Sequence, residues 1–203
     1  VHPHHASDLT ATHEPLLRSL LGRPEVVAVG ECGLDYHRDF SPRDAQRQAF
    51  AWQLQWGRDC GKPLFLHQRD AHADFVAILR EQSRMPLHGV AHCFTGEDAE
   101  LDAYLELGLH IGITGWICDE RRGTHLLDLV REIPADRLLV ETDAPYLAPV
   151  PFRGRRNEPS FVVNTVRVLA EAAGVSEAEA AAITTDNFFC LFKKMPRPAE
   201  VKS

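Results

Sequence analysis

Four side chains that can bind a metal ion each come shortly after a short apolar run of the sequence. They are Glu31, His67, His92 and Asp143, and the runs before them are residues 26–30, 63–66, 89–91 and 138–140. Carboxylates and imidazoles are common ligands of divalent cations. A divalent cation in an enzyme can polarise a phosphoryl or carbonyl oxygen and generate hydroxide from water at neutral pH. The pattern therefore predicts a site for one or two divalent cations in a hydrolase.

Each of these residues also has a structural explanation when it is taken alone. A single histidine at the end of a strand more often bonds a backbone carbonyl than a metal, and Glu31 could pair with an arginine. Two carboxylates and two histidines at the ends of separate strands are harder to explain in this way, because neighbouring carboxylates repel each other unless a cation lies between them. We therefore favour a metal site.

A further carboxylate, Glu141, precedes Asp143 by two positions. Side chains two apart in a strand point to the same face of the sheet. One of the two carboxylates could therefore bind metal while the other accepts a proton. Alternatively, Glu141 could only hydrogen-bond a metal ligand or a lysine inside the barrel. The sequence leaves both roles open.

The apolar runs predict the elements that position these residues. Runs at 26–30, 63–66, 89–91, 111–113 and 138–140 are too short for helices and are bounded by Gly, Pro or polar residues, which is typical of buried strands. Around them, apolar residues recur at helical spacing in the segments 16–20, 50–60, 75–79, 101–105, 126–130 and 162–169. Strands and helices that alternate at intervals of roughly thirty residues indicate right-handed crossovers and a parallel sheet.

Two folds contain such a sheet, an open doubly wound sheet and an eight-stranded (β/α)8 barrel. The sequence has no G-x-G-x-x-G or G-x-x-x-x-G-K motif, which argues against a doubly wound nucleotide-binding fold. Polar residues at successive strand ends favour the barrel, in which such residues converge at the carboxyl-terminal rim. We predict an α/β protein of the TIM-barrel type, with one domain over residues 1–203 and a tail from Met195 to Ser203.

The first residues suggest where the barrel begins. The chain starts at Val1, and His2-Pro3-His4-His5 has the character of a loop that leaves a strand. We therefore expect the barrel to be incomplete at its N-terminus, without its first two strands and most of the third.

Composition narrows the class of protein. No apolar stretch approaches the ~20 residues that a membrane-spanning helix needs, and the five cysteines form no Cys-x-x-Cys pair. We expect no membrane association and a location in the reducing cytoplasm. The net charge of −7 argues against a protein that wraps duplex nucleic acid with a basic face. Cys32 and Cys93 adjoin predicted ligands, but no oxyanion-type turn accompanies them, so we do not expect nucleophilic thiols.

Clustered arginines could bind phosphate at the mouth of such a barrel. Two arginine clusters, Arg121-Arg122 and the run from Arg153 to Arg156, lie in segments that should be rim loops, and a guanidinium group suits a phosphate. We take Arg121, Arg122 and Arg156 as the candidate substrate-binding residues. For any one arginine a solvated position or an ion pair with a neighbouring glutamate is an equal alternative. Trp116 and Tyr146 could stack on a nucleobase or fill the barrel interior.

Several motifs follow one another along nearly the whole chain. They are ECGLD at 31–35, HQRD at 67–70, HCFTG at 92–96, IGITGW at 111–116, CDERRG at 118–123, ETDAPY at 141–146 and RNEP at 156–159. Together they resemble the ordered motifs of the TatD family of metal-dependent deoxyribonucleases, and most closely those of its bacterial members. The resemblance implies a (β/α)8 barrel and a divalent-metal-dependent phosphodiesterase that removes nucleotides from a 3′ end and prefers single strands.

The resemblance also implies roles for particular residues. It implies metal ligands at Glu31, His67 and His92, a ligand or acid–base group at Asp143, and further active-site residues at His2 and Glu141. Mg²⁺ is the expected cofactor, with Mn²⁺ or Zn²⁺ as alternatives. The expected substrate is single-stranded DNA, or RNA, and the expected setting is DNA repair or turnover by a protein that is monomeric at full length.

Two other functions stay open. A metal-dependent amidohydrolase that acts on a small molecule would use the same barrel, but such sites usually have a His-x-His pair on the first strand and often a modified lysine, and Lys62 precedes its strand instead of ending it. A barrel without some of its strands would also leave sheet edges whose unpaired groups cost ~1–3 kcal/mol each when buried. The short chain could therefore be an inactive scaffold.

Overall fold

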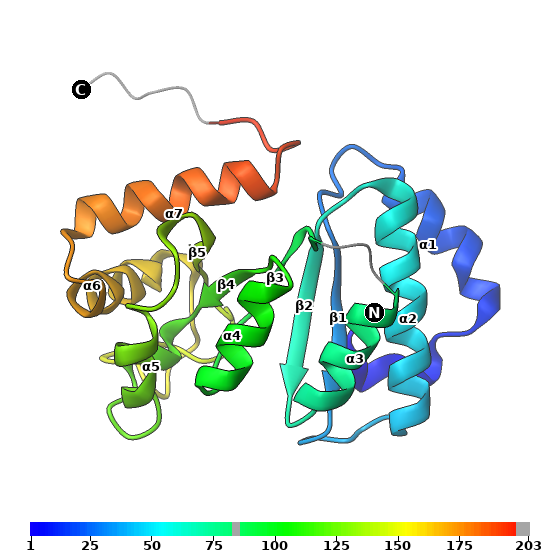
Figure 1. Ribbon diagram of the computed structural model, residues 1–203, viewed down its shortest axis with the longest axis horizontal. Helices are drawn as coiled ribbons and strands as arrows, with labels where there is room; N and C mark the ends of the chain where they lie inside the picture. Colours follow the sequence, from blue (N-terminus) through cyan, green and yellow to red (C-terminus); the bar gives the residue numbers. More distant parts are fainter. Residues whose placement is uncertain (83–85, 198–203) are drawn as a thin grey trace.

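A sheet of five parallel strands, paired in the order of the chain, forms the centre of the protein (Figure 1). The computed structural model describes residues 1–82 and 86–197. The strands are β1 (Val29–Asp35), β2 (Leu64–Arg69), β3 (Gly89–Ala91), β4 (His110–Ile113) and β5 (Leu138–Val140). Because each neighbouring pair is parallel, the carboxyl ends of all these strands lie along the same edge. The predicted α/β class with a parallel sheet is confirmed.

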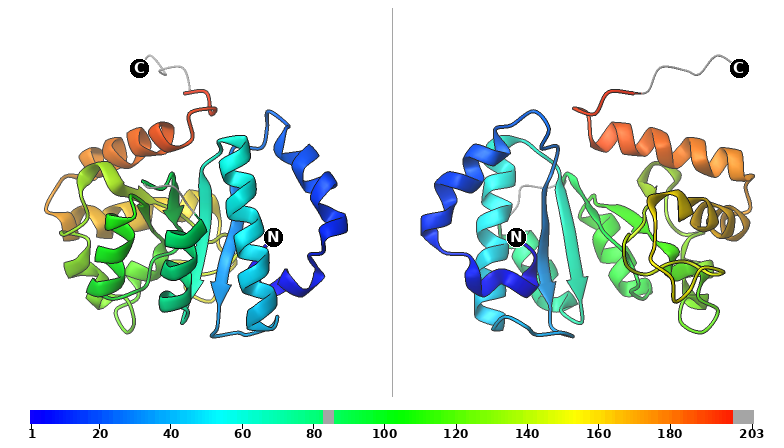
Figure 2. Two further views of the ribbon diagram at one scale, coloured as in Figure 1. Left: turned by 45° about the vertical axis from the view of Figure 1, so that its right-hand side comes forward. Right: turned by 180° about the vertical axis from the view of Figure 1, so that it is seen from behind.

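Helices connect the strands and flank the sheet. They are α1 (Glu14–Leu21), α2 (Arg43–Cys60), α3 (His72–Gln82), α4 (Asp98–Glu106), α5 (Thr124–Leu129), α6 (Val162–Ala173) and α7 (Glu177–Leu191). Short 3-10 helices occupy Pro3–Asp8, Ala11–His13, Gly115–Cys118, Ala135–Arg137 and Pro159–Phe161. The views in Figures 1 and 2 agree that α1 and α2 lie at the β1 end of the sheet, whereas α6 and α7 lie at the other end.

The helical segments predicted from apolar spacing are all present, but α7 was not predicted. Its sequence is rich in alanine, so the apolar stripe that marks a helix is weak. The available signal was at its start, where the Ser176 hydroxyl accepts the Glu179 N–H and the Glu179 side chain accepts the Ser176 N–H in a capping box. Among the described helices, none combines the length and the apolar character needed to cross a membrane.

The first two strands are longer than predicted, and this changes the position of two site residues. The first strand was placed at 26–30, but β1 runs from Val29 to Asp35, because a shift of register between Gly30 and Cys32 lets the chain continue its pairing with β2. β2 likewise continues through a polar segment to Arg69. The predicted position of Glu31 and His67 after their strands is therefore wrong, and both lie inside them.

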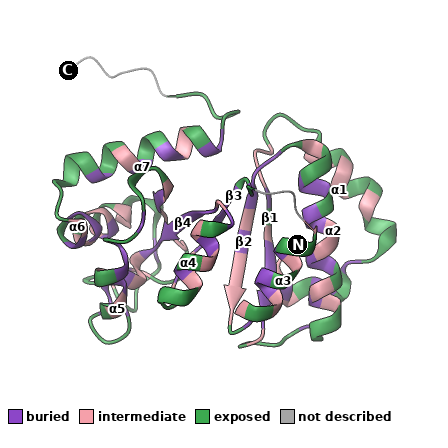
Figure 3. Ribbon diagram, in the orientation of Figure 1, coloured by how far each residue is buried: buried purple, intermediate pink, exposed green. Residues whose placement is uncertain are grey.

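Apolar side chains cover both faces of the sheet, as a parallel sheet requires. Leu64 and Leu66 of β2 pack with the helices in the main core, where the Phe50 and Phe75 rings stack with centroids 5.2 Å apart. Phe65, which points to the opposite face, joins a second cluster with residues from the end of α7. Figure 3 shows buried residues on β3 and β4 and on the inner sides of the helices, whereas most of β2 is intermediate. The tail predicted at 195–203 is described only to Arg197, and the rest lies outside the described residues.

Candidate active site

The carboxyl ends of the strands border a cleft with a volume of about 1210 Å³. The predicted ligands Glu31, His67, His92 and Asp143 all line it, and so does His2. The structure therefore brings residues from four different strands or strand ends to one surface. Within that surface they form two groups.

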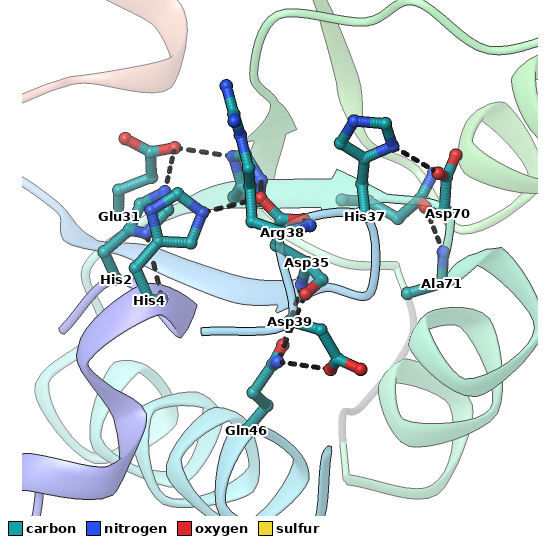
Figure 4. Close-up of polar contacts among 12 residues, drawn as sticks. His2, His4, Glu31, Asp35, His37, Arg38, Asp39, Gln46, Asp70 and Ala71 are labelled. Atoms are coloured by element: carbon teal, nitrogen blue, oxygen red, sulfur yellow. Dashed lines mark hydrogen bonds and ion pairs between the residues drawn. The ribbon is translucent and has the colours of Figure 1, made fainter. Parts of the chain in front are cut away.

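The first group consists of His2, Glu31 and His67. One ligand atom of each lies within 4.8 Å of those of the other two, and among the described residues this is the one set with that metal-binding geometry. Glu31 Oε1 is at the centre, 2.9 Å from His67 Nδ1 and 3.4 Å from His2 Nε2. Figure 4 shows Glu31 reaching from β1 toward His2, the residue that directly precedes the first 3-10 helix.

Backbone features of β1 place Glu31 beside His67. Gly30 pairs with Phe65 and Cys32 pairs with Leu66, so Glu31 is the extra residue of a β-bulge, and bulges often redirect a side chain next to an active site. Gly33 has a φ of 147°, and a Cβ there would lie 1.8 Å from the His67 carbonyl oxygen. Glycine is therefore required for the close approach of β1 to β2 at the site.

The pKa values in this group reflect competition between burial and charge. Burial raises the pKa of Glu31, but hydrogen bonds from His2 and His67 outweigh it and hold that pKa well below its usual range. Burial lowers the pKa of His67, but the Asp35 and Glu31 carboxylates outweigh it and raise that pKa. Glu31 is therefore a carboxylate anion at neutral pH, and a metal cation can bind it without first displacing a proton from it.

The second group consists of His92, Glu141 and Asp143. His92 directly follows β3, and its Nδ1 lies 2.6 Å from Glu141 Oε2 while its Nε2 lies 3.4 Å from Asp143 Oδ1. Burial lowers the pKa of His92, but the charge of Glu141 and hydrogen bonds to both carboxylates raise it to about 10. Without a metal, the His92 ring is therefore a cation held between two carboxylates.

Glu141 is placed to orient His92. Its Oε2 also accepts the Cys93 N–H at 3.1 Å, and its side chain is only 12% exposed. A Cβ at Gly112 would lie 2.3 Å from the Glu141 carboxyl carbon, so the glycine provides the room for this carboxylate beside β4. Of the two roles left open by the sequence, the contacts favour the hydrogen bond to a ligand.

The arginines of the cleft are organised by one buried aspartate. Asp119 contacts three arginines: Arg122 at 2.8 Å, Arg153 at 2.7 Å and Arg121 at 3.6 Å. Burial raises the pKa of Asp119, but hydrogen bonds from the Arg121 backbone and the Arg122 side chain outweigh it and lower the pKa to about 2. Of the three candidate arginines, Arg122 lines the cleft, whereas Arg121 and Arg156 are not among its lining residues. Arg153, which begins the predicted cluster that ends at Arg156, also lines the cleft.

Two aromatic side chains, Trp116 and Tyr146, also line the cleft. The Arg122 guanidinium lies 4.2 Å from the centroid of the Trp116 ring, which is a cation–π contact. Tyr146 is 72% exposed and lines the cleft, so its ring is free to stack. Trp116 lines the cleft and is also partly buried against the main core. Its position is therefore compatible both with stacking on a base and with filling the interior.

Comparison with known proteins gives the family. A family model described as TatD related DNase matches residues 1–193 of the chain. The chain belongs to the TatD family. The protein named 3′-5′ ssDNA/RNA exonuclease TatD in Rahnella sp. (strain Y9602) is 50% identical over 196 residues, which are 95% of this chain and 74% of that protein. The protein of the same name in Pantoea vagans (strain C9-1) is 48% identical over 197 residues, 95% of this chain and 76% of that protein.

Solved structures agree with this result. The TatD homologue YjjV of Escherichia coli K12 superposes with a TM-score of 0.88 at 29% identity, over 97% of this chain and 75% of that chain. An uncharacterised amidohydrolase from Saccharomyces cerevisiae superposes with a TM-score of 0.74 at 24% identity, over 88% of this chain and 68% of that chain, and this likeness concerns the fold alone. Membership of the TatD family confirms the predicted class of enzyme, a nuclease of the exonuclease type, and favours it over the amidohydrolase alternative.

The TatD family implies a divalent metal, and the residues of the cleft fit one. Glu31 and His67 offer a carboxylate oxygen and an imidazole nitrogen that already face each other, and such a pair suits Mg²⁺, Mn²⁺ or Zn²⁺ in different degrees. His92 and Asp143 offer the same pair of ligand types in the second group. Both cysteines beside the ligands are unsuited to nucleophilic attack, because burial raises the pKa of the Cys32 and Cys93 thiols to about 12.

Two residues of this TatD site were missed as site residues. Asp35 ends β1 with its carboxylate between His4 and His67, and His4 lines the cleft. Both lie inside motifs noted in the sequence. Their contacts join positions more than thirty residues apart, and no local spacing predicts that kind of contact.

Proposed function

We propose that this TatD-family chain is a 3′-5′ exonuclease that hydrolyses phosphodiester bonds of single-stranded DNA or RNA with the help of Mg²⁺. The observation that carries the proposal is the pairing of a carboxylate with a histidine twice in one cleft, as Glu31 with His67 and as Asp143 with His92. The activity named for the relatives that are 48–50% identical supports it.

Glu31, His67, His92 and Asp143 would hold the metal. A bound divalent cation neutralises charge on the phosphoryl oxygens and lowers the pKa of water toward neutrality. The Asp143 side chain is 33% exposed, so it opens toward the cleft and can accept a proton from the attacking water. Glu141 keeps the His92 ring in place through Nδ1.

His2 directs a hydrogen-bond donor at the centre of the site. Its Nδ1 accepts the His4 N–H at 3.2 Å, so the proton of the ring is on Nε2, which lies 3.4 Å from Glu31 Oε1. A ring N–H in this position can donate a hydrogen bond to a phosphate oxygen of the substrate. We therefore assign His2 as an active-site residue that binds the reacting phosphate.

Arginine and aromatic side chains that line the cleft would bind the nucleic acid strand. Arg122 and Arg153 present guanidinium groups that bind phosphate well. Tyr146 offers an exposed ring on which a base can stack for ~1–3 kcal/mol. Bases are free to stack in this way when the strand is unpaired, and this supports a single-stranded substrate.

The likeness to the TatD homologue of Escherichia coli supports a barrel of eight strands, in which the edges of β1 and β5 would pair with further strands. A monomeric state, a cytoplasmic location and a role in DNA repair stay predictions from the sequence.

The proposal is tested with a single-stranded oligonucleotide labelled at its 5′ end. We expect a ladder of products shortened one nucleotide at a time in the presence of Mg²⁺, and no products after EDTA is added. A phosphorothioate bond at the 3′ end should block the reaction, and the same bond at the 5′ end should not. His67→Ala should lower the rate by at least roughly a hundredfold, on the scale seen for groups that act directly in catalysis.

His13→Ala is the matched control, because His13 lies in the second 3-10 helix away from the cleft lining. It should cleave at the parental rate. Cleavage by His67→Ala at the parental rate would contradict the assigned site, and a chain that binds metal but never cleaves would favour the inactive scaffold.

A further inference from the structure

Asp35 is a buried carboxylate at the edge of the proposed metal site. It is the last residue of β1 and only 1% exposed. Its Oδ2 lies 2.7 Å from His4 Nε2 and 3.4 Å from His67 Nε2, so one carboxylate oxygen faces two imidazole rings. Figure 4 shows Asp35 and His4 on the side of the site nearest to α2.

The position of Asp35 is fixed from several sides. Its backbone N–H donates to Gln46 Oε1 at 2.8 Å, and Gln46 Nε2 donates back to the Asp35 carbonyl at 3.1 Å. Gln46 is itself buried in α2 and donates to the Ser41 carbonyl. Asp35 Oδ1 accepts the Arg38 N–H at 2.8 Å. The carboxylate therefore has little freedom to move away from the histidines.

His67 lies between two carboxylates that contact different ring nitrogens. Its Nδ1 faces Glu31 in the cleft at 2.9 Å. Its Nε2 is buried, has no hydrogen-bond partner among the described residues, and lies 3.4 Å from Asp35 Oδ2. A histidine that binds metal through one nitrogen commonly donates the N–H of the other to a carboxylate, which fixes the ring and its tautomer.

We propose that Asp35 is a positioning residue of the metal site, which holds the His67 ring through Nε2 so that Nδ1 is presented to the metal beside Glu31. This inference rests on the proposed function. Glu141 has the corresponding contact with His92, since it meets Nδ1 and leaves Nε2 toward Asp143. Each histidine of the site then has one carboxylate that orients it and another that shares the cleft with it.

The test measures Mn²⁺ binding to the whole metal-free chain by calorimetry. Asp35→Asn keeps the size of the side chain but removes its charge, and we expect it to weaken binding roughly 10–100-fold, as loss of such an outer partner does elsewhere. Asp39→Asn is the matched control, because Asp39 also contacts Gln46 but is in the loop after β1. It should bind Mn²⁺ as the parent does. Parental affinity in Asp35→Asn would overturn the inference.

A second measurement separates positioning from a purely structural role. In a His67→Ala background, Asp35→Asn should cause no further loss of Mn²⁺ affinity, because its effect passes through His67. An equal loss in both backgrounds would overturn the inference. If Asp35→Asn does not fold, Asp35→Ser replaces it, since it is smaller and keeps an acceptor; failure of both to fold would show that Asp35 is needed for the fold and would also overturn the inference.

The outcomes for the two proposals are distinct. A parent chain that cleaves DNA while Asp35→Asn binds Mn²⁺ normally contradicts the role of Asp35 alone. A parent chain that binds Mn²⁺ but cleaves no nucleic acid contradicts the proposed function, and the affinity measurements on Asp35 still decide its role.

Discussion

The chemistry of single residues in this site depends on which carboxylate each histidine meets. His92 is 8% exposed and lies between Glu141 and Asp143, and this surrounding raises its pKa to about 10 despite burial. A metal that binds His92 at neutral pH must therefore displace a proton, which links metal affinity to pH.

The same pKa predicts how stability changes with pH in the metal-free protein. The folded pKa of His92 is above the value of ~6.5 expected in the unfolded chain. The pair with Glu141 should therefore stabilise the fold fully below pH ~6.5, and this contribution should be lost as the pH rises through about 10. Replacement by Glu141→Gln should lower the free energy of unfolding most at pH 6 and least at pH 10.

Urea unfolding in EDTA at pH 6, 8 and 10 provides the measurement. Asp74→Asn, which removes a surface carboxylate paired with Arg47, is the control for a general effect of charge. A difference between the parent and Glu141→Gln that stays constant over this range would show that His92 does not titrate as inferred.

The convergence of the proposed ligands on one cleft could be predicted from the sequence, because each stands in or shortly after a strand that begins with an apolar run. Glu31, His67 and His92 are examples, and the parallel sheet brings them to one edge. Asp35 could not be predicted in this way, because its proposed role comes from a contact with His67 across the fold.

At the scale of elements, loops and strand irregularities determine where strands end and which side chains reach the cleft. The pattern of apolar residues does not predict these features. The bulge at Glu31 and the polar end of β2 extend two strands beyond their apolar runs. The loop after the Gly115–Cys118 helix folds around Asp119, and this selects Arg122 and Arg153 for the cleft. Loop conformation of this kind depends on a buried acceptor, and the sequence alone shows only that arginines are clustered.

This loop gives a prediction about substrate binding. Asp119→Ala removes the carboxylate that holds Arg122 and Arg153, so we expect KM for a single-stranded oligonucleotide to rise roughly tenfold, equivalent to ~1.4 kcal/mol. The value of kcat should change little, because the proposed metal ligands are in other elements of the fold. Steady-state kinetics at two salt concentrations measure this, and the salt dependence of KM should weaken.

Asp128→Ala is the matched control, because Asp128 also pairs with an arginine, Arg131. Asp128 differs from Asp119 in that it lies on α5 and is exposed to solvent. It should leave KM unchanged. A fall in kcat with an unchanged KM in Asp119→Ala would instead place Asp119 among the groups that support the chemical step.

At the scale of the whole molecule, the parallel sheet explains why one cleft collects the site. All strands end at the same edge, and the cleft there is lined by histidines, carboxylates and arginines. The net charge of −7 does not oppose this use, because the positive charge needed for phosphate is local and comes from arginines at the cleft. The fold class and the family followed from the sequence, whereas the division of the ligands into two groups required coordinates.

The central claim is that the metal binds in this cleft between Glu31 and His67. Anomalous X-ray scattering from crystals of the chain soaked with Mn²⁺ tests it most directly. We expect a peak within roughly 2–2.5 Å of both the Glu31 carboxylate and the His67 ring, the range for divalent cations and hard ligands. A peak that contacts only carboxylates outside the cleft, or no peak at a Mn²⁺ concentration that supports cleavage, would contradict the claim.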